Sequence, residues 1–124
     1  MFKSKVKVKK ITKGRIRKRI RKKINGSEER PRVFVFKSNR YLYLQAIDDE
    51  HGHVLAYATS LDKDFRAEHK NTKNLAASLA LGEVMAKKLK EQKKERILFD
   101  RGIYPYHGRV KALAEGLRKG GLVF

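Results

Sequence analysis

The first 24 residues of the chain carry thirteen Lys or Arg and no Asp or Glu, and the first acidic residue is Glu28. This segment therefore contributes +13 of the formal net charge of +19. Like charges at this density repel one another and cannot pack into a hydrophobic core, so the segment needs an external polyanion to become ordered. A nucleic acid is the favoured polyanion, because each neutralised phosphate releases condensed counterions.

The rest of the chain is long enough for one folded domain. We predict a basic RNA-binding arm over residues 1–27, partly helical, and a single α/β domain over residues 28–124. The chain has no cysteine, which excludes disulfides, cysteine-based zinc sites and cysteine nucleophiles. No apolar run approaches the roughly 20 residues that a membrane-spanning helix needs, so no membrane partner is expected.

The arm contains one helical pattern. Ile16, Ile20 and Ile24 recur every four residues among basic side chains, which predicts a cationic helix with a narrow apolar stripe. Asn25-Gly26 is a typical helix end. Such a helix can dock its stripe on its own domain or lie among phosphates, and both can hold at once. Its predicted RNA-binding residues are Arg15, Arg17, Lys18, Arg19, Arg21, Lys22 and Lys23.

The domain begins with three apolar segments that are separated by polar turns. Strands are predicted over residues 33–36, 41–47 and 53–59, with turns over residues 37–40 and 48–52. Short turns between consecutive strands indicate an antiparallel meander. Adjacent apolar residues in the first and third strands suggest that the sheet is covered on both faces, at least in part.

Two helices and a fourth strand follow the meander. Residues 60–70 are predicted to be a polar loop and residues 71–92 a long helix. A buried strand over residues 97–99 and a last helix over residues 107–119 complete the order βββαβα. Because a helix separates the fourth strand from the meander, that strand should pair in parallel. The predicted fold class is therefore α/β (α+β-like), with an antiparallel meander, one parallel strand and two helices.

Both helices show apolar positions at helical spacing. The long helix is predicted to bury Leu75, Leu79, Ala86 and Leu89, and Gly82 would permit the close approach of a neighbouring element. The last helix has the same spacing at Val110, Leu113, Ala114 and Leu117. Gly120-Gly121 is expected to stop this helix.

Basic and small polar side chains flank the first strand and the turn after it. They are Arg30, Arg32, Lys37, Ser38, Asn39 and Arg40. Such groups suit phosphate and ribose contacts, which position a protein on RNA. Along the next strand, Tyr41, Tyr43 and Gln45 alternate and therefore share one face of the sheet. An exposed Tyr43 can stack on an unpaired base; the alternative is that this face covers a helix.

A second polar group lies between the last strand and the last helix. It consists of Arg101, Tyr104, His107 and Arg109. Free backbone N–H groups at the start of a helix also favour anions, so we predict RNA contact here. The alternative is a capped helix that follows an ordinary surface loop.

Acidic residues permit a different interpretation. A metal-dependent nuclease would hold two Mg²⁺ ions for phosphodiester hydrolysis, and the candidate carboxylates are Asp48, Asp49, Asp62, Asp64 and Asp100. However, consecutive aspartates are ordinary turn formers. Glu50, His51 and His53 form a polar hairpin tip that would bind a metal only weakly. No phosphate-binding loop or nucleophile motif is present, so we predict no catalytic residue, no metal and no cofactor.

Three segments resemble one known family. Residues 99–124 (FDRGIYPYHGRVKALAEGLRKGGLVF) closely resemble the C-terminal signature of bacterial large-subunit ribosomal proteins of the eighteenth family, the 5S rRNA binders. Residues 30–39 (RPRVFVFKSN) resemble the first strand and turn of that family, and residues 43–49 (YLQAIDD) its second strand. One departure is Ile103, where the family has a second glycine.

The resemblance spans essentially the whole chain, arm included. It implies a mixed α/β domain without catalysis, in the central protuberance of the large ribosomal subunit in the cytoplasm. The implied partners are 5S rRNA, the large-subunit rRNA and neighbouring ribosomal proteins. We therefore predict a structural constituent that binds 5S rRNA and helps attach it to the large-subunit rRNA. The alternatives are a metal-dependent nucleic-acid-processing enzyme and a nonspecific basic RNA-packaging protein.

Overall fold

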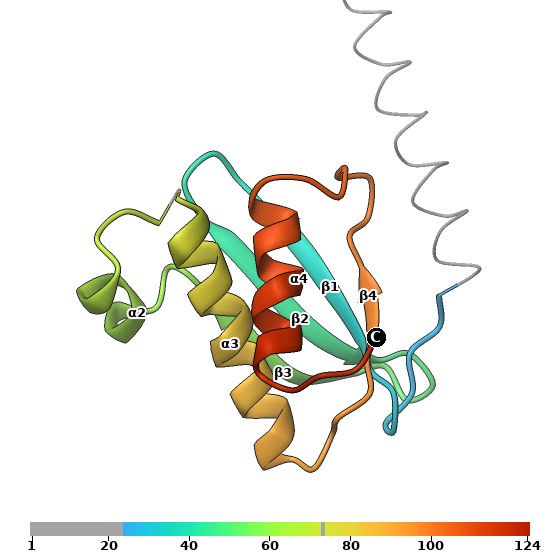
Figure 1. Ribbon diagram of the computed structural model, residues 1–124. Coiled ribbons are helices and arrows are strands. Elements are labelled where there is room, and N and C mark those ends of the chain that lie inside the picture. Colours follow the sequence, from blue (N-terminus) through green and yellow to red (C-terminus); the bar gives the residue numbers. More distant parts are fainter. Residues whose placement is uncertain (1–23, 73) are drawn as a thin grey trace, which may run out of the picture.

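Figure 1 shows the computed structural model of the protein, which describes residues 24–72 and 74–124. Within these residues the strands are β1 (Arg32–Lys37), β2 (Leu42–Asp48), β3 (His53–Thr59) and β4 (Leu98–Asp100). The helices are α2 (Lys63–Glu68), α3 (Leu75–Glu91) and α4 (Arg109–Lys119). The predicted order βββαβα is confirmed, with the short α2 as an addition.

The strands form one mixed sheet in the order β3-β2-β1-β4. β2 pairs antiparallel with both β1 and β3, whereas β4 pairs in parallel with β1. This arrangement confirms the predicted meander with one parallel strand, which a crossover through helices requires. In the β1–β2 register Phe36 lies opposite Tyr43, and Phe34 lies opposite Gln45. Because paired residues of antiparallel strands share a face, these four side chains lie on the same side of the sheet.

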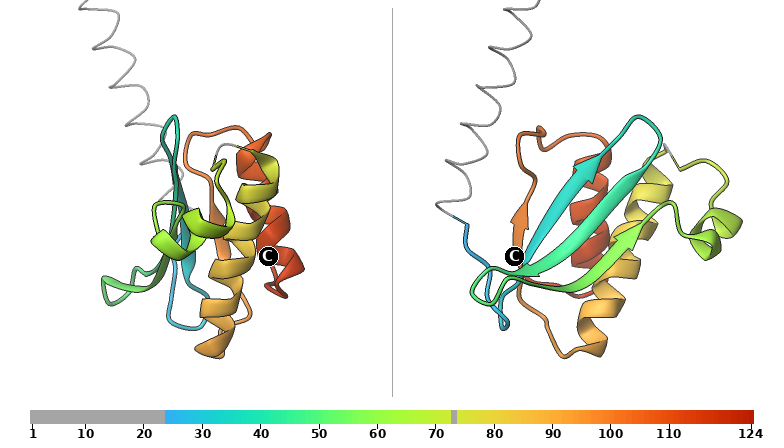
Figure 2. Two further views of the ribbon diagram at one scale, coloured as in Figure 1. Left: turned by 90° about the vertical axis from the view of Figure 1, so that its left-hand side faces the viewer. Right: turned by 180° about the vertical axis from the view of Figure 1, so that it is seen from behind.

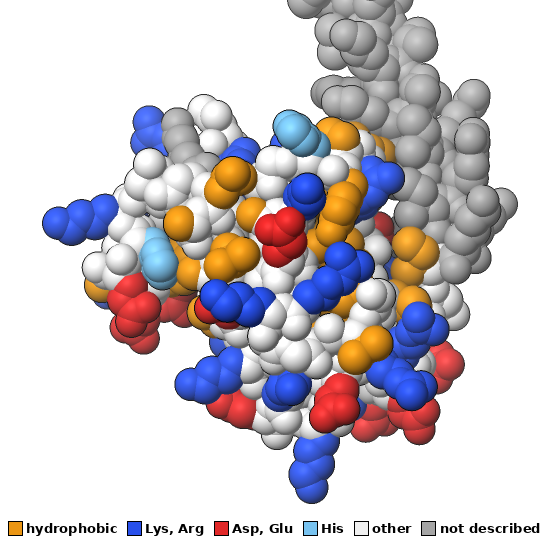
Figure 3. Space-filling model, viewed as in Figure 1, with side chains coloured by type: hydrophobic (Ala, Val, Ile, Leu, Met, Phe, Trp, Pro, Cys, Tyr) orange, Lys and Arg blue, Asp and Glu red, His pale blue; other side chains and the backbone are white. Residues whose placement is uncertain are grey.

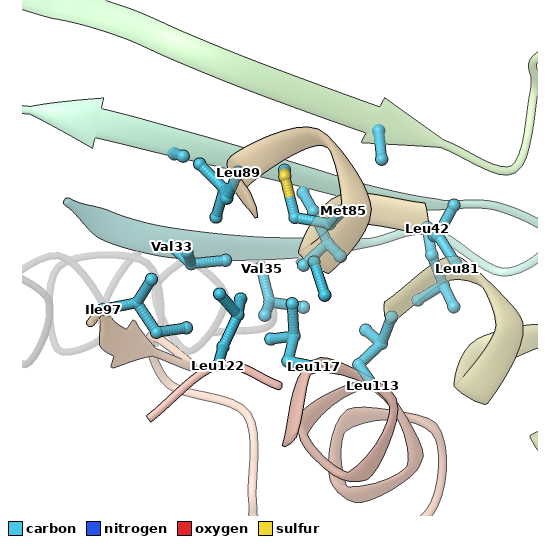
Figure 4. Close-up of a cluster of buried hydrophobic side chains, with 14 of the residues drawn as sticks. Val33, Val35, Leu42, Leu81, Met85, Leu89, Ile97, Leu113, Leu117 and Leu122 are labelled. Carbon is cyan, nitrogen blue, oxygen red and sulfur yellow. The ribbon is translucent and has the colours of Figure 1, made fainter. Parts of the chain in front are cut away.

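Both α3 and α4 cover the other side of the sheet (Figure 2). The side chains that point toward these helices are fully buried, and Figure 4 shows them packed into one cluster. Its largest members from the sheet and helices are Val33, Val35, Leu42, Leu44, Leu81, Met85, Leu89, Leu113 and Leu117. The domain is therefore built from two layers around a single hydrophobic core.

The side of the sheet away from the helices is open over much of its area. Phe36 and Tyr57 are 46% and 62% exposed there. Near the start of β1, Gly26 packs so closely on Arg32 that an added Cβ would lie 2.8 Å from the Arg32 Cβ. Among the described residues, the expected cover on both faces therefore holds only at the end of the sheet where Gly26 lies.

The backbones of α3 and α4 are in close contact where two glycines face the opposite helix. A Cβ on Gly116 would lie 2.1 Å from the carbonyl oxygen of Leu79, and one on Gly82 would lie 2.4 Å from that of Leu113. Neither position has room for a side chain. The predicted role of Gly82 is confirmed, and Gly116 provides the matching approach from α4.

The buried face of α3 is rotated from the predicted one. Ala86 and Leu89 are buried as predicted, but Leu75 is 58% exposed and Leu79 is only partly buried. The core positions that were not predicted are Ala77, Ser78, Leu81 and Met85. In α4 the predicted stripe is confirmed, with buried Val110, Leu113, Ala114 and Leu117.

Helix bounds also differ from the prediction, and α4 begins at Arg109 instead of residue 107. α3 begins at Leu75, behind the N-cap Asn74, and therefore starts later than residue 71. The predicted loop over residues 60–70 contains α2, which is capped by Asp62 and buries only Phe65. A six-residue helix with one buried side chain has no periodicity that a sequence pattern can reveal.

The predicted arm helix and its basic side chains lie outside the described residues, apart from Ile24. Residues 24–26 have no regular secondary structure and lead toward β1. In the part of the chain that is described, no helix has the length and apolar character needed to cross a membrane.

Candidate nucleic-acid interface

The two groups of predicted RNA-binding residues in the domain lie together at one end of the sheet. Figure 1 shows the β1–β2 turn and the β4–α4 loop at this same end. The Tyr104 hydroxyl lies 3.3 Å from the backbone nitrogen of Lys37, which donates to it. The Lys37 Nζ lies 5.2 Å from the centre of the Tyr104 ring. The Arg109 Nη2 donates to the backbone oxygen of Ser38 at 3.3 Å. Long-range contacts therefore join the turn and the loop into one surface.

The start of α4 faces this surface without a side-chain cap. Gly108 occupies the N-cap position with φ of 59°, and no side chain bonds the first N–H groups. RNA contact at this helix start and the alternative of a capped helix that follows a surface loop both stay predictions. The guanidinium of Arg101 donates to the carbonyl oxygen of Tyr104, which holds the loop in shape. The Arg109 Nη1 is buried and has no hydrogen-bond partner among the described residues.

Acidic residues are absent from one end of the domain. We define the basic end as residues 37–41, 69–72 and 101–111, which contain no Asp or Glu. Its cationic side chains are Lys37, Arg40, Lys70, Arg101, Arg109 and Lys111. The N-termini of α3 and α4 also point to this end (Figure 1), and each adds partial positive charge.

The opposite end of the domain holds many of the acidic residues. These are Glu28, Glu29, Asp48, Asp49, Glu50, Glu91 and Glu95. On the face seen in Figure 3, most acidic side chains lie along the lower and left margins, where Lys and Arg side chains lie beside them, whereas the upper margin carries cationic and histidine side chains. The opposite end also holds cations such as Lys90 and Lys94, but these lie beside acids, whereas the cations of the basic end do not. A polyanion is therefore attracted to the basic end.

Aromatic side chains adjoin the basic end on the open side of the sheet. Phe34, Phe36, Tyr43 and Gln45 line a shallow hollow of about 370 Å³. The rings of Phe36 and Tyr43 are in contact, with centroids 5.9 Å apart. Within residues 24–72 and 74–124, α3 and α4 lie on the other side of the sheet, so Tyr43 covers neither of these two helices. The alternation of Phe34 and Phe36 along β1 was the signal that could have added them to the predicted site.

The remaining predicted residues of the first strand do not join this surface. Arg30 is exposed but precedes β1, so it lies at the end of the strand away from Lys37. Arg32 is only 4% exposed, and its guanidinium is bound by Asp49 and Asp100. The expected cationic edge therefore does not include Arg32, whose side chain serves the fold.

Arg32 forms a buried ion cluster that links distant parts of the chain. Its Nε lies 2.9 Å from the Asp49 Oδ2, and its Nη1 lies 2.8 Å from the Asp100 Oδ2. Hydrogen bonding to Asp49 raises the pKa of Arg32, although burial acts in the opposite sense. The Gly26 backbone nitrogen donates to the Asp49 carboxylate at 2.7 Å. The cluster thus ties β1, the β2–β3 turn and β4 to Gly26, near the end of the predicted arm.

The acidic residues considered for a two-metal site are not assembled into one. Asp49 and Asp100 bind Arg32, and Asp62 caps α2. Among the described residues, Asp48, Glu50 and His51 have possible ligand atoms within 4.8 Å of one another. However, Asp48 already accepts hydrogen bonds from the backbone of Glu50 and from His51. Asp48, Asp49, Asp62 and Asp100 therefore each have a partner within the fold.

The Asp48–His51 pair makes a testable prediction about pH. The His51 Nδ1 lies 2.7 Å from the Asp48 Oδ2, and this hydrogen bond raises the pKa of His51. Replacing Asp48 with asparagine should lower that pKa, because the amide carries no charge but still accepts the backbone bonds of the turn. The measurement is an NMR titration of the His51 ring. In the control variant Glu50→Gln the pKa should change less, and an unchanged pKa in Asp48→Asn would contradict the assignment.

The pKa shifts of His51 and Asp48 determine how the stability of the folded domain changes with pH. For His51 the raised pKa favours the folded state below the ordinary histidine pKa, and this contribution is lost as the pH rises through the raised value. For Asp48, burial acts to raise the pKa, but the bonds from His51 outweigh it and the net pKa is lowered. Its contribution is present above the ordinary aspartate pKa and is lost as the pH falls through the lowered value.

Comparisons with known proteins find a family and close relatives. Residues 7–124 match the family described as ribosomal L18 of archaea, bacteria, mitochondria and chloroplast. The chain is 54% identical over 106 residues to the large ribosomal subunit protein uL18 of Dictyoglomus turgidum, covering 86% of this chain and 87% of that protein. The protein of the same name from Caldicellulosiruptor saccharolyticus is 50% identical over 107 residues, covering 86% of each chain. That of Solibacter usitatus is 47% identical over 116 residues, covering 94% and 95%.

Proposed function

The chain belongs to the ribosomal L18 family, and on this basis we propose that it binds 5S rRNA and helps attach it to the large-subunit rRNA in the central protuberance. Its relatives are named as large-subunit ribosomal proteins. The chain is therefore a structural constituent of the ribosome and not an enzyme, and in a bacterial cell its place is the cytoplasmic ribosome. The proposal adds the RNA partner, neighbouring ribosomal proteins and the residues that make the contacts.

The basic end is the observation that carries the proposal. Its cations come from three segments that long-range contacts hold together, so the surface is preorganised before RNA arrives. Its three segments contain no acid that would oppose a phosphate. Arginine is well suited to such contacts because its planar guanidinium can pair with two phosphate oxygens at once. Phosphate contacts of this kind position a protein on RNA but carry little sequence information.

The aromatic hollow supplies the other half of the proposed interface. Sequence-specific RNA recognition mostly uses unpaired bases, which stack on aromatic side chains. A base that stacks on Tyr43 or Phe36 contributes about 1–3 kcal/mol. Gln45, on the same side of the sheet, can donate to and accept from the edge of that base. Because Lys37 directly follows Phe36, the phosphate next to a stacked base can reach the basic end.

Residues of the domain and of the arm have different proposed roles. The proposed domain contacts are Lys37, Ser38, Asn39, Arg40, Tyr43, Arg101, His107 and Arg109. Tyr104 acts by positioning the loop, since its hydroxyl is bound to the backbone of Lys37. The arm cations from Arg15 to Lys23 supply charge neutralisation. Arg30 remains an exposed candidate outside the basic end, and Arg32 is left out because it is buried.

The remaining alternative is a nonspecific RNA-packaging protein. Such a protein needs only net charge, and any distribution of that charge over its surface would serve. The segregation of acids from the basic end and the adjoining aromatic hollow favour selective binding instead.

Competition binding near 0.15 M salt tests the proposal, since nonspecific charge contacts are partly screened at about this ionic strength. Labelled 5S rRNA should stay bound in the presence of excess tRNA and excess scrambled RNA of equal length. The double variant Arg101→Gln/Arg109→Gln should lower the slope of log affinity against log salt by about 2, because it removes two phosphate contacts.

The matched control is Lys87→Gln/Lys93→Gln, which removes the same charge from exposed positions near the C-terminal end of α3. This control should change the slope of log affinity for 5S rRNA against log salt much less than Arg101→Gln/Arg109→Gln does. Equal competition by tRNA and scrambled RNA would mean that charge alone explains binding, and the proposed selectivity would be wrong.

A further inference from the structure

A second hollow, which is lined by cations, overlaps the basic end. It measures about 300 Å³ and is lined by Arg40, Tyr41, Arg66, Lys70, Asn71 and Thr72. It lies between the β1–β2 turn and the segment that joins α2 to α3, and both views in Figure 2 show this segment close to the turn. Arg66 lies outside the basic end, and apart from Arg40 none of these residues is among the domain contacts proposed above.

Specific contacts hold the walls of this hollow in place. The Thr72 Oγ1 donates to the carbonyl oxygen of Arg40 at 2.8 Å, which fixes the segment to the turn. The ring of Phe65 is buried and stacks on His69, with centroids 4.7 Å apart. The His69 backbone nitrogen also donates to the carbonyl oxygen of Phe65 at 2.8 Å. The segment that carries the cations is therefore anchored on both sides of the hollow.

Three positive charges meet in the hollow without an acidic partner. Arg40, Arg66 and Lys70 take part in no ion pair within the described part of the chain. No Asp or Glu lines the hollow. Like charges brought together in this way repel one another, so an anion bound among them lowers the free energy of the folded protein. The hollow is at the lower limit of ordinary ligand sites in size.

We propose that this hollow binds a phosphate of the RNA backbone and that Tyr41 packs against the adjoining nucleotide. The hollow shares the cations Arg40 and Lys70 with the basic end. An RNA strand that crosses the basic end can therefore continue into the hollow without leaving the surface. The two guanidinium groups can bind phosphate oxygens in pairs, and Lys70 adds a point charge. The identity of the RNA rests on the proposed function, whereas the phosphate site rests on the hollow itself.

The chemistry of the walls favours a nucleotide over an acidic peptide. A carboxylate would satisfy the charges equally well. However, Tyr41 offers an aromatic ring beside the cations, and Asn71 and Thr72 offer polar groups of the kind that bind ribose hydroxyls. A phosphate followed by a sugar and a base can use all three kinds of group at once.

The test uses the full chain and the double variant Arg66→Gln/Lys70→Gln. Loss of one phosphate contact should lower affinity for 5S rRNA by roughly tenfold near 0.15 M salt and reduce the salt slope by about 1. Both side chains are exposed, so the thermal midpoint should not change. Lys87→Gln/Lys93→Gln is again the control of equal charge. If the two double variants bind alike, the phosphate site is wrong.

A second measurement identifies the ligand. The backbone amide signals of Tyr41, Asn71 and Thr72 should shift in NMR spectra on addition of a short single-stranded RNA. Inorganic phosphate should shift them only at much higher concentration, and poly-glutamate should not saturate them. Saturation by phosphate or by poly-glutamate at the same concentration as RNA would overturn the assignment to an RNA backbone.

The outcomes separate this inference from the proposed function. If the wild-type chain does not prefer 5S rRNA over tRNA, but Arg66→Gln/Lys70→Gln weakens binding to both, the proposed function fails and the phosphate site stands. If the wild-type chain selects 5S rRNA and the double variant binds like the control, the phosphate site fails and the proposed function stands.

Discussion

Replacing Arg32 with methionine should destabilise the domain by about 3–5 kcal/mol, which is a large part of the stability of an ordinary domain. Methionine keeps the apolar stem of the side chain but leaves Asp100, which is 2% exposed, as a buried charge without its partner. Urea unfolding at neutral pH should show a lower midpoint with an unchanged slope, because the same surface is exposed on unfolding.

Arg30→Met is the matched control, since Arg30 is exposed and lies two residues earlier in the chain. Its free energy of unfolding should stay within about 0.5 kcal/mol of the wild type. The double variant Arg32→Met/Asp100→Asn should recover part of the lost stability, because the neutral amide costs less to bury than an unpaired carboxylate. If Arg32→Met were as stable as Arg30→Met, the ion cluster would not support the fold.

The elements that were predicted well are those whose signals are local. β3 has the predicted bounds because polar turns lie on both sides of its apolar run. In α4 a strong apolar stripe ends at Gly120, so both the buried face and the end of the helix follow from nearby residues. The parallel pairing of β4 followed from a topological rule that applies to any crossover between strands.

The elements that were predicted poorly depend on contacts between distant residues. Leu75 and Leu79 had the right spacing for a core stripe, but the face of α3 that meets α4 is set by the close approach of Gly82 and Gly116. Arg32 appeared to be one more surface cation, because its partner Asp100 is 68 residues away in the chain. Neither fact can be derived from local hydrophobic spacing or from local charge.

The candidate site shows the same difference between features with local sequence signals and features that depend on distant residues. Sequence reasoning found the turn with Lys37 and the loop with Tyr104 as separate groups, and only the folded chain brings them into contact. The second hollow was missed because Arg66 and Lys70 come from a segment that was expected to be an ordinary polar loop. The short helix α2 and the stacking of Phe65 on His69 give that segment a fixed shape.

Deleting residues 1–24 should leave the domain folded but strongly reduce both the affinity for 5S rRNA and its dependence on salt. Each lost phosphate contact lowers the slope of log affinity against log salt by about 0.7–0.9, so losing half of the thirteen arm cations should lower it by roughly 5. The domain should keep its thermal midpoint, because the contacts of Gly26 with Asp49 and the buried ion cluster remain. Affinity is measured at several salt concentrations, and folding by circular dichroism.

A chain with a scrambled arm of the same composition separates charge from sequence in this experiment. The arm pattern places isoleucines every four residues, and scrambling removes that spacing while it keeps all thirteen cations. If the scrambled chain has the wild-type salt slope but a lower affinity, the arm adds specific contacts to its charge. If it fully matches the wild type, the arm acts by charge alone. If the truncated chain bound as tightly as the full chain at every salt concentration, the arm would have no part in RNA binding, and the basic end would have to supply all of it.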